Sequence, residues 1–297
     1  MGDAPLVFVV GLQKSGTTLL LRLLMSTSVF RNPVKFEGKD VWGDEPAFAP
    51  TGYPVGHVYQ RHEGRAGHVV GAEDASEEIA EHLRKGWGKG ISGNKALVLK
   101  SPFNSGRIPW LRAMFPDATV VAVIRRPLPN VFSLRKKYTP NRFLKQGPVE
   151  GWWGVKPAGW RDLVQDDKLR QCAWQWRRIN EKLWNDRDLI DRFVAYHDLC
   201  ADPESGVAEL AHKTVGRVPT MDFPPISVLD DEYLQGGSLE SANRVYGRTK
   251  SLDVTKARRP ADLLPPLTEA EQAAVLEICG PTATMLGLDG GERSSAG

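Results

Sequence analysis

The chain has 297 residues, of which 41% are hydrophobic and 25% are charged, so its composition is that of an ordinary globular protein and its length favours one α/β domain. A net charge of only +3 argues against a protein that binds polyanions over its whole surface, although it allows a local basic cleft. The three cysteines, Cys172, Cys200 and Cys279, are scattered without CxxC spacing, which indicates reduced thiols rather than a disulfide framework or a metal site.

The sequence does not indicate a targeting segment or a membrane span. No stretch approaches the roughly 20 apolar residues that a membrane span requires. The first residues lack the basic region of a signal peptide, and Leu6 occupies a position where N-myristoylation needs Ser or Thr. We therefore expect a soluble, cytoplasmic protein that binds no nucleic acid.

Short runs rich in β-branched residues predict the strands, which are in chain order Leu6–Val10, Ala96–Leu99, Thr119–Ile124 and Phe193–Tyr196. Each run is followed by a helical stretch, an alternation typical of a parallel sheet with helices on both faces. The clearest helices are predicted at about 17–26 and about 168–187. A last helix is predicted from Thr268 toward Met285, because Thr268 and Glu271 form a capping box.

Two long irregular regions, 31–67 and 138–165, interrupt this alternation. The second contains Trp152, Trp153 and Trp160 among glycines and prolines, and so much apolar surface predicts an ordered loop. These tryptophans either form an apolar wall against a substrate, with Trp152 and Trp153 as substrate-binding residues, or anchor their own loop to the core.

Neither an internal repeat nor a linker divides the chain. We expect a P-loop-like parallel sheet flanked by helices, with residues 1–290 as one domain and residues 291–297 as a disordered tail.

Residues 11–18, GLQKSGTT, follow the first predicted strand and precede a leucine-rich helix. The two glycines have the spacing of a phosphate-binding loop, and Thr18 has the position of its hydroxyl residue. Backbone N–H groups at the start of a helix bind a compact anion through hydrogen bonds and through the helix dipole. The lysine is displaced, however, because Thr17 stands where a kinase keeps it and Lys14 offers its charge from the loop.

A second anion-binding signal follows the predicted strand Thr119–Ile124. A nucleoside triphosphatase places a Mg²⁺-binding carboxylate there, whereas this chain has Arg125 and Arg126. Ser133 comes eight residues after Arg125 on a predicted helix that begins at Pro127, so the two side chains are placed to clamp a phosphate. Two anion sites without a metal site indicate a ligand with phosphates at both ends of a nucleoside.

This constellation resembles the sulfotransferases that use 3′-phosphoadenosine 5′-phosphosulfate (PAPS). In that family a loop like QKSGTT holds the 5′-phosphosulfate, and an Arg-x7-Ser pair like Arg125 and Ser133 holds the 3′-phosphate. LVLKSP at 97–102 is similar to the family's strand ending in Lys-Ser or Lys-Thr, and 193–216 is similar to a strand–helix unit. A terminal helix followed by LGL also matches, so the resemblance extends through most of the chain.

The resemblance implies a role for each matching residue. Lys14 and Lys100 correspond to lysines that interact with the bridging oxygen or the departing phosphate, so we expect both to be catalytic. Ser101 either contacts the substrate or caps the next element. Arg248 lies in a basic stretch, NRVYGRTK, that lacks the family's RKGxxG form. The expected nucleotide-binding residues are Gln13, Lys14, Ser15, Gly16, Thr17, Thr18, Arg125, Ser133 and Arg248.

Transfer to a hydroxyl or an amine of a small-molecule or carbohydrate acceptor requires a base. The family's cytosolic branch has a histidine two residues after the strand lysine, where this chain has Pro102. The branch of Golgi carbohydrate and tyrosyl-protein enzymes uses a glutamate, which Glu37, 23 residues after Lys14, matches best. We therefore place the chain nearer that branch and expect Glu37 to be catalytic and to contact the substrate. The competing candidates are Asp44, Glu45, His57 and His62.

Two other interpretations fit parts of the sequence. A nucleotide kinase with an aberrant loop would use ATP and Mg²⁺, against which the two arginines argue. A non-catalytic module would bind 3′-phosphoadenosine 5′-phosphate without turnover. Taken singly, the loop is also compatible with a tight turn, Arg125 and Arg126 with a sheet edge in solvent, and Ser133 with an exposed helix position. For Arg126 we expect the solvent-exposed position, since the family commonly has an aspartate there. The sequence indicates neither the acceptor nor the oligomeric state.

Overall fold

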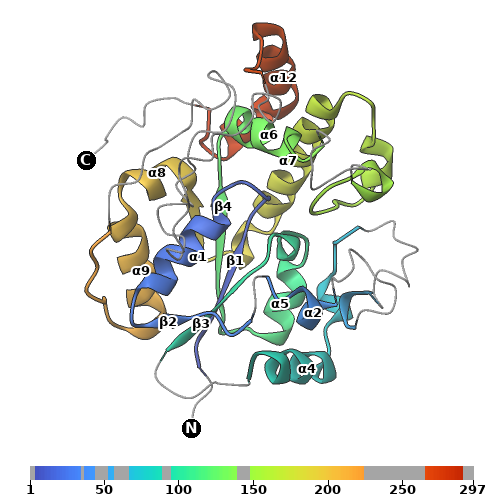
Figure 1. Cartoon of the computed structure of the whole chain (residues 1–297). Helices are drawn as coiled ribbons and strands as arrows, with labels where there is room; N and C mark the ends of the chain where they lie inside the picture. The colour runs from blue at the N-terminus through green and yellow to red at the C-terminus, as the bar shows by residue number, and fades with distance from the viewer. Residues whose placement is uncertain are drawn as a thin grey trace, which may run out of the picture.

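The computed structural model describes residues 4–34, 37–43, 53–56, 67–88, 95–138, 148–223 and 265–289. At its centre is a parallel sheet whose described strands lie in the order β2-β3-β1-β4-β5 (Figure 1). The strands are β1 (Leu6–Val10), β2 (Phe30–Arg31), β3 (Ala96–Lys100), β4 (Thr119–Ile124) and β5 (Arg192–Ala195). The four predicted strands are thus confirmed, and the short edge strand β2 was not predicted.

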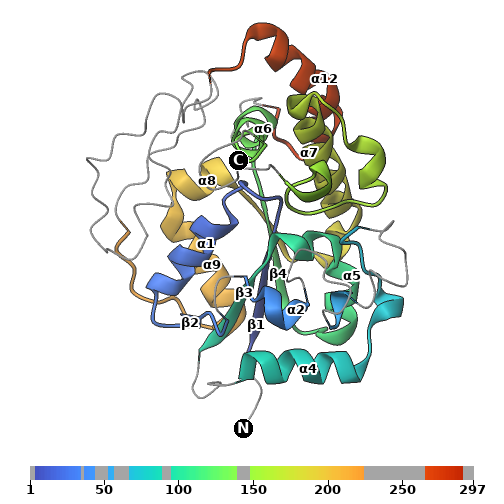
Figure 2. The ribbon, with the colours of Figure 1, turned by 45° about the vertical axis from the view of Figure 1, so that its right-hand side comes forward.

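Helices cover both faces of the sheet. The helices are α1 (Thr17–Ser26), α2 (Lys39–Trp42), α4 (Glu77–Gly88), α5 (Ile108–Met114), α6 (Pro127–Arg135), α7 (Lys168–Asn185), α8 (Tyr196–Ala201), α9 (Pro203–Val215) and α12 (Glu269–Met285). Helices α1, α8 and α9 lie on one side of the sheet, and α2, α4, α5 and α7 lie on the other (Figures 1 and 2). Among the described residues, no helix has both the length and the apolar character needed to cross a bilayer.

The strands contribute to two hydrophobic cores because both of their faces are buried. Along β1, Phe8 and Val10 belong to the core beneath α4, α5 and α7, whereas Val7 and Val9 belong to the core beneath α1, α8 and α9. A strand buried on both faces has no polar alternation, which explains its continuous apolar sequence. The α/β class expected from the sequence is therefore the observed one.

An aromatic cluster fixes the start of the region 31–67, which the sequence predicts to be irregular. Trp42, at the end of α2, is buried against Trp87 of α4 and Phe8 of β1, with ring centroids 5.4 and 6.3 Å away. The N–H group of Trp42 donates to the carbonyl of Gly38, 3.0 Å away. This packing fixes Gly38 and therefore also its neighbour, Glu37, at a defined position beside the sheet.

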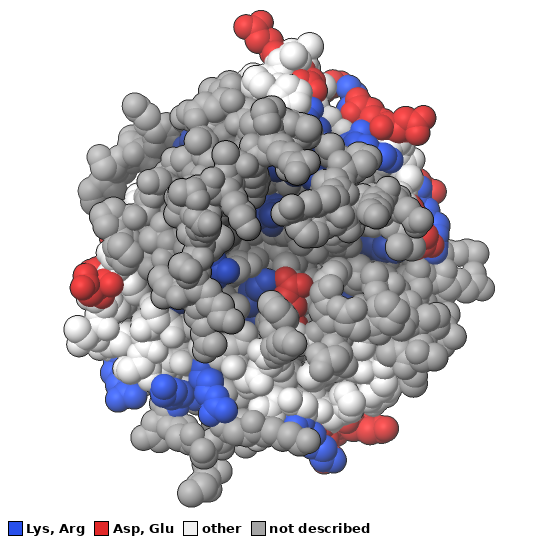
Figure 3. Space-filling view, viewed as in Figure 1, with Lys and Arg blue, Asp and Glu red and all other residues white. Residues whose placement is uncertain are grey.

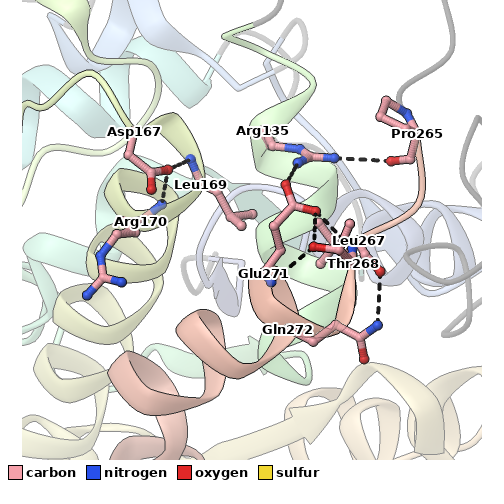
Figure 4. A network of polar contacts seen from close by, with 9 residues as sticks. All are labelled: Arg135, Asp167, Leu169, Arg170, Pro265, Leu267, Thr268, Glu271 and Gln272. Atoms are coloured by element: carbon pink, nitrogen blue, oxygen red, sulfur yellow. Dashed lines mark hydrogen bonds and ion pairs between the residues drawn. The ribbon is translucent and has the colours of Figure 1, made fainter.

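The last helix, α12, is joined to α6 by a polar network (Figure 4). The Oγ1 of Thr268 accepts from the N–H of Glu271 at 3.2 Å, and Glu271 Oε2 accepts from the N–H of Thr268 at 2.8 Å, so the predicted capping box is confirmed. Arg135, the last residue of α6, donates to Glu271 Oε1 at 2.8 Å and to the carbonyl of Pro265 at 3.1 Å. The helix that carries Ser133 is therefore braced from the C-terminal side.

Candidate active site

The loop between β1 and α1 has a left-handed backbone at three positions, Gly11 (φ 136°), Lys14 (φ 71°) and Gly16 (φ 109°). A Cβ atom at Gly11 would lie 2.3 Å from the carbonyl oxygen of Val123, and one at Gly16 would lie 2.5 Å from the ring of Tyr196, so both positions require glycine. Lys14 has a side chain and adopts this conformation at a cost of about 1–2 kcal/mol. Strain of this kind is typical of ligand-binding loops.

Side chains from distant parts of the chain hold this loop in place. The N–H of Gly11 donates to Ser105 Oγ at 2.8 Å. The carbonyl of Gln13 accepts from Asn130 Nδ2 at 3.0 Å, and the carbonyl of Lys14 accepts from Arg125 Nη1 at 3.2 Å. Since no described side chain caps the start of α1, the helix begins with backbone donors and the positive end of its dipole facing the loop.

Three buried oxygen atoms beside this loop have no hydrogen-bond partner within the described part of the chain. They belong to the side chains of Gln13, Ser15 and Ser101, which are 8%, 1% and 0% exposed. A buried polar atom without a partner costs about 1–3 kcal/mol, so a structure gains by bringing a polar ligand to it. Ser101 stands at the N-cap position of a 3-10 turn, Pro102–Gly106, yet its hydroxyl makes no capping bond.

Lys100 and Glu37 form an ion pair close to the loop. Lys100 is the last residue of β3, pairs in register with Val9 of β1, and is only 6% exposed. Its Nζ lies 2.5 Å from Glu37 Oε1, and the glutamate side chain is 24% exposed. The fold thus brings together two residues that the sequence predicts to be catalytic. On the face shown in Figure 3, basic and acidic side chains adjoin near the centre.

The residues expected at the second anion site, Arg125 and Ser133, are 6% and 7% exposed. The guanidinium of Arg125 lies over the ring of Tyr196, 4.3 Å from its centroid, and the Arg125 carbonyl accepts from Trp176 Nε1 at 3.1 Å. For Arg125 and Ser133, the alternatives of a solvated arginine and an exposed helix serine are therefore wrong. Asn130 and Ser133 are three residues apart on α6, so they lie on the same side of this helix.

The tryptophan-rich loop is anchored by two of its three tryptophans. Trp152 and Trp160 are 3% and 1% exposed, their ring centroids are 5.9 Å apart, and Trp152 Nε1 donates to the carbonyl of Val155 at 3.0 Å. These contacts support the anchoring alternative for both residues, rather than a wall against a substrate. Trp153 is partly exposed, with Lys137 Nζ 5.2 Å from its ring centroid.

This loop also touches the glycine-rich loop. A Cβ atom built on Gly154 (φ 88°) would lie 2.9 Å from the side chain of Gln13, so the two loops are in direct contact. Gln175 Nε2 of α7 donates to the carbonyls of Trp153 and Val155, each at 3.0 Å, and holds the second loop against the core. The region 148–165 therefore forms one side of the candidate site.

Sequence reasoning did not identify Ser105, Asn130 and Gly154, whose contacts with the loop join residues far apart in the chain. For Asn130 the available signal was a polar residue three positions before Ser133, on the same side of α6. Thr17 and Thr18 are the first two residues of α1, as predicted. Arg248, the competing base candidates and the predicted tail lie outside the described residues; those base candidates are Asp44, Glu45, His57 and His62.

Comparison with known proteins identifies the class. A sequence model described as the sulfotransferase family matches residues 5–214, which is most of the chain. The chain therefore belongs to the sulfotransferase family, and the resemblance predicted from its motifs is confirmed. Which branch of the family it belongs to stays a prediction. A comparison with curated proteins gave no match.

Solved sulfotransferase structures are similar to the chain at low identity. Sulfotransferase STF9 from Mycobacterium avium has 14% identity and a TM-score of 0.49, with 96% of this chain and 77% of that chain covered. A sulfotransferase from Alicyclobacillus acidocaldarius has 18% identity and a TM-score of 0.44, with coverages of 79% and 91%. The sulfotransferase domain of the olefin synthase from Synechococcus PCC 7002 has 16% identity and a TM-score of 0.42, with coverages of 95% and 96%.

Proposed function

We propose that the protein transfers the sulfuryl group of PAPS to a hydroxyl, or an amine, of a small-molecule or carbohydrate acceptor. The observation that carries this proposal is the ion pair of Lys100 with Glu37, at 2.5 Å, beside the strained loop that follows β1. The pair sets a carboxylate and an ammonium group next to backbone donors suited to a phosphosulfate.

In the proposed reaction, Glu37 accepts the proton of the acceptor hydroxyl as the acceptor oxygen forms its bond to sulfur. The bond between sulfur and the bridging oxygen of PAPS breaks at the same time, and adenosine 3′,5′-bisphosphate leaves. Lys14, Lys100 and the N–H groups at the start of α1 stabilise the charge that develops on the departing 5′-phosphate. Lys100 also holds the Glu37 carboxylate in place.

Each predicted ligand of the nucleotide keeps its role in this proposal. Gln13, Ser15, Gly16, Thr17 and Thr18 would surround the 5′-phosphosulfate, and the buried hydroxyl of Ser15 would donate to one of its oxygens. Arg125 and Ser133 would bind the 3′-phosphate, with Arg248 as a further candidate. Ser101 and Trp153 would face the acceptor. No metal ion takes part in the proposed transfer, and action in the cytoplasm stays a prediction.

Calorimetry tests the choice of nucleotide. We expect adenosine 3′,5′-bisphosphate to bind without a divalent cation and more tightly than ATP with Mg²⁺, because two separated anion sites match its two phosphates. Tighter binding of ATP with Mg²⁺, or no binding of the bisphosphate, would overturn the proposal.

The role of Glu37 is tested with Glu37→Gln. We expect the variant to lose about 100-fold or more in kcat, because an amide cannot accept the proton, and to keep its affinity for the bisphosphate. Glu150→Gln is the matched control, because Glu150 also pairs with a buried lysine, Lys156, at 2.8 Å. A sulfation rate in Glu37→Gln equal to that of the control would remove Glu37 as the base.

A further inference from the structure

One buried residue of α6, Asn130, belongs to neither predicted anion site and contacts the loop of the first. It is 0% exposed, and its Nδ2 donates to the carbonyl of Gln13 at 3.0 Å. Since a carbonyl oxygen can only accept, the amide must present its nitrogen to Gln13. The other amide atom, Oδ1, has no partner among the described residues. An apolar side chain would avoid this cost at position 130 but would leave the Gln13 carbonyl without its donor, so the contact with the loop explains the asparagine.

The contact controls the direction of a loop N–H group. In a trans peptide the carbonyl and the following N–H point to opposite sides, so fixing the Gln13 oxygen toward Asn130 turns the N–H of Lys14 away from α6. The bond from Arg125 Nη1 to the Lys14 oxygen, at 3.2 Å, fixes the next peptide, whose N–H group, that of Ser15, donates to the Leu12 carbonyl at 3.1 Å. The carbonyl oxygens of Gln13 and Lys14 are thereby turned away from the anion that the loop would bind. A carbonyl oxygen that pointed at this anion would repel it.

We infer that Asn130 is a positioning residue for nucleotide binding, and that the segment 125–133 sets both anion sites at once. This inference rests on the proposed function. Ser133 and Arg125 contact the 3′-phosphate, while Asn130, on the same side of α6 as Ser133, holds the loop that receives the 5′-phosphate. Asn130 itself touches no part of the nucleotide, so its effect reaches the ligand through the Gln13 carbonyl.

The test compares two nucleotides by calorimetry, adenosine 3′,5′-bisphosphate and adenosine 5′-phosphate. Asn130→Leu keeps the number and branching of the side-chain heavy atoms and has no donor. We expect it to weaken the binding of both nucleotides by about tenfold, the effect of one lost hydrogen bond. The ratio of the two affinities should stay constant. Ser133→Ala should weaken only the bisphosphate, because the second nucleotide lacks a 3′-phosphate.

Asn180→Leu is the matched control. Asn180 is 2% exposed and also donates from Nδ2 to a carbonyl, that of Trp176 at 2.7 Å, but this bond lies inside α7. We expect the control to lower the melting temperature and to leave both affinities unchanged. If Asn130→Leu lowers only the melting temperature, or weakens only the bisphosphate, the positioning role is wrong.

A second variant, Asn130→Asp, tests the inference if Asn130→Leu does not fold. In Asn130→Asp the ionised carboxylate would repel the Gln13 oxygen, whereas the protonated acid can donate to it. Its affinity relative to the wild type, measured at each pH, should therefore recover as the pH falls, and a constant relative affinity contradicts the inference. If the wild type itself binds neither nucleotide, the proposed function is wrong. If the wild type binds both and Asn130→Leu lowers only the melting temperature, the positioning role alone is wrong.

Discussion

Two buried lysines of this protein each pair with a glutamate, and the comparison shows which features indicate an active site. The side chains of Lys100 and Lys156 are both 6% exposed, and their Nζ atoms lie 2.5 Å from Glu37 and 2.8 Å from Glu150. Residue type and the burial of the lysine are therefore the same in the two pairs, and the two distances differ by only 0.3 Å. The first pair joins residues 63 positions apart at the end of a central strand, whereas the second joins residues 6 positions apart in one loop.

The contacts of Lys156 indicate that its ion pair with Glu150 supports the structure of their own loop. Its Nζ lies 3.9 Å from the ring centroid of the buried Trp160, and its N–H donates to His68 Nδ1 at 2.7 Å. Burial lowers the pKa of Lys156, and the hydrogen bond to Lys156 lowers the pKa of Glu150. The Lys100 pair differs because it lies beside a strained loop and buried oxygens without described partners. Those neighbours, together with the ion pair, distinguish the candidate site from the pair of Lys156 and Glu150.

The largest expected difference between the pairs is in catalysis. Lys100→Met removes a charge that would stabilise the departing phosphate, and we expect kcat to fall about 100-fold or more. Lys156→Met should lower the free energy of unfolding and change kcat by less than about threefold, since its charge lies within the loop support. Saturating PAPS kinetics and urea unfolding measure the two effects. Equal losses of kcat in both variants would break the distinction.

A smaller effect is expected from the contact between the glycine-rich loop and the loop 148–165, which carries Lys156 and Glu150. Gly154→Ala would push the side chain of Gln13, and we expect turnover to fall about tenfold, because displacements of about 1 Å at a site can cost that much or more. Gly216→Ala is the control, since Gly216 also has a left-handed φ of 67° but nothing within 4 Å of the added Cβ. Both variants should lose about 1–2 kcal/mol of stability. Unchanged turnover in Gly154→Ala would show that the loops act independently.

The smallest effect is the pH dependence of the second pair. Because the folded-state pKa of Glu150 is below its ordinary value of 4.5, the pair stabilises the fold above that pH and loses this contribution as pH falls through the folded pKa. The carboxylate is nearly half exposed, so we expect only about 0.5 kcal/mol. Unfolding free energies of wild type and Glu150→Gln should differ near neutral pH and converge in acid. A difference that grows in acid would contradict this.

Local patterns predicted the elements better than they predicted the contacts of the site. The strands Leu6–Val10 and Thr119–Ile124 and the helix Thr17–Ser26 have the predicted bounds, since apolar runs and glycines act over a few residues. β2 has only two residues, which is too short for a periodic signal. Helix α4 was also not predicted.

The sequence did not predict the pairing of Glu37 with Lys100, because no spacing rule joins residues on separate elements. The family resemblance implied only that each of the two residues is catalytic. For Trp152 the sequence predicted that the side chain has an apolar partner, but not which partner. Its apolar surface required a partner, as predicted, but composition could not tell a core neighbour, here Trp160, from a substrate. The contacts of Asn130 and Gly154 with the glycine-rich loop depend on how β1, β4 and the loop 148–165 come together.

The side chains that hold the glycine-rich loop have a consequence for synthesis of the protein. The loop is synthesised before the side chains that hold it, because Ser105, Arg125 and Asn130 follow their loop partners by 94, 111 and 117 residues. Closing such long segments is slow relative to forming a local turn. A nascent chain that ends before β3 therefore carries the whole glycine-rich motif in its sequence but has none of the three side chains that hold it.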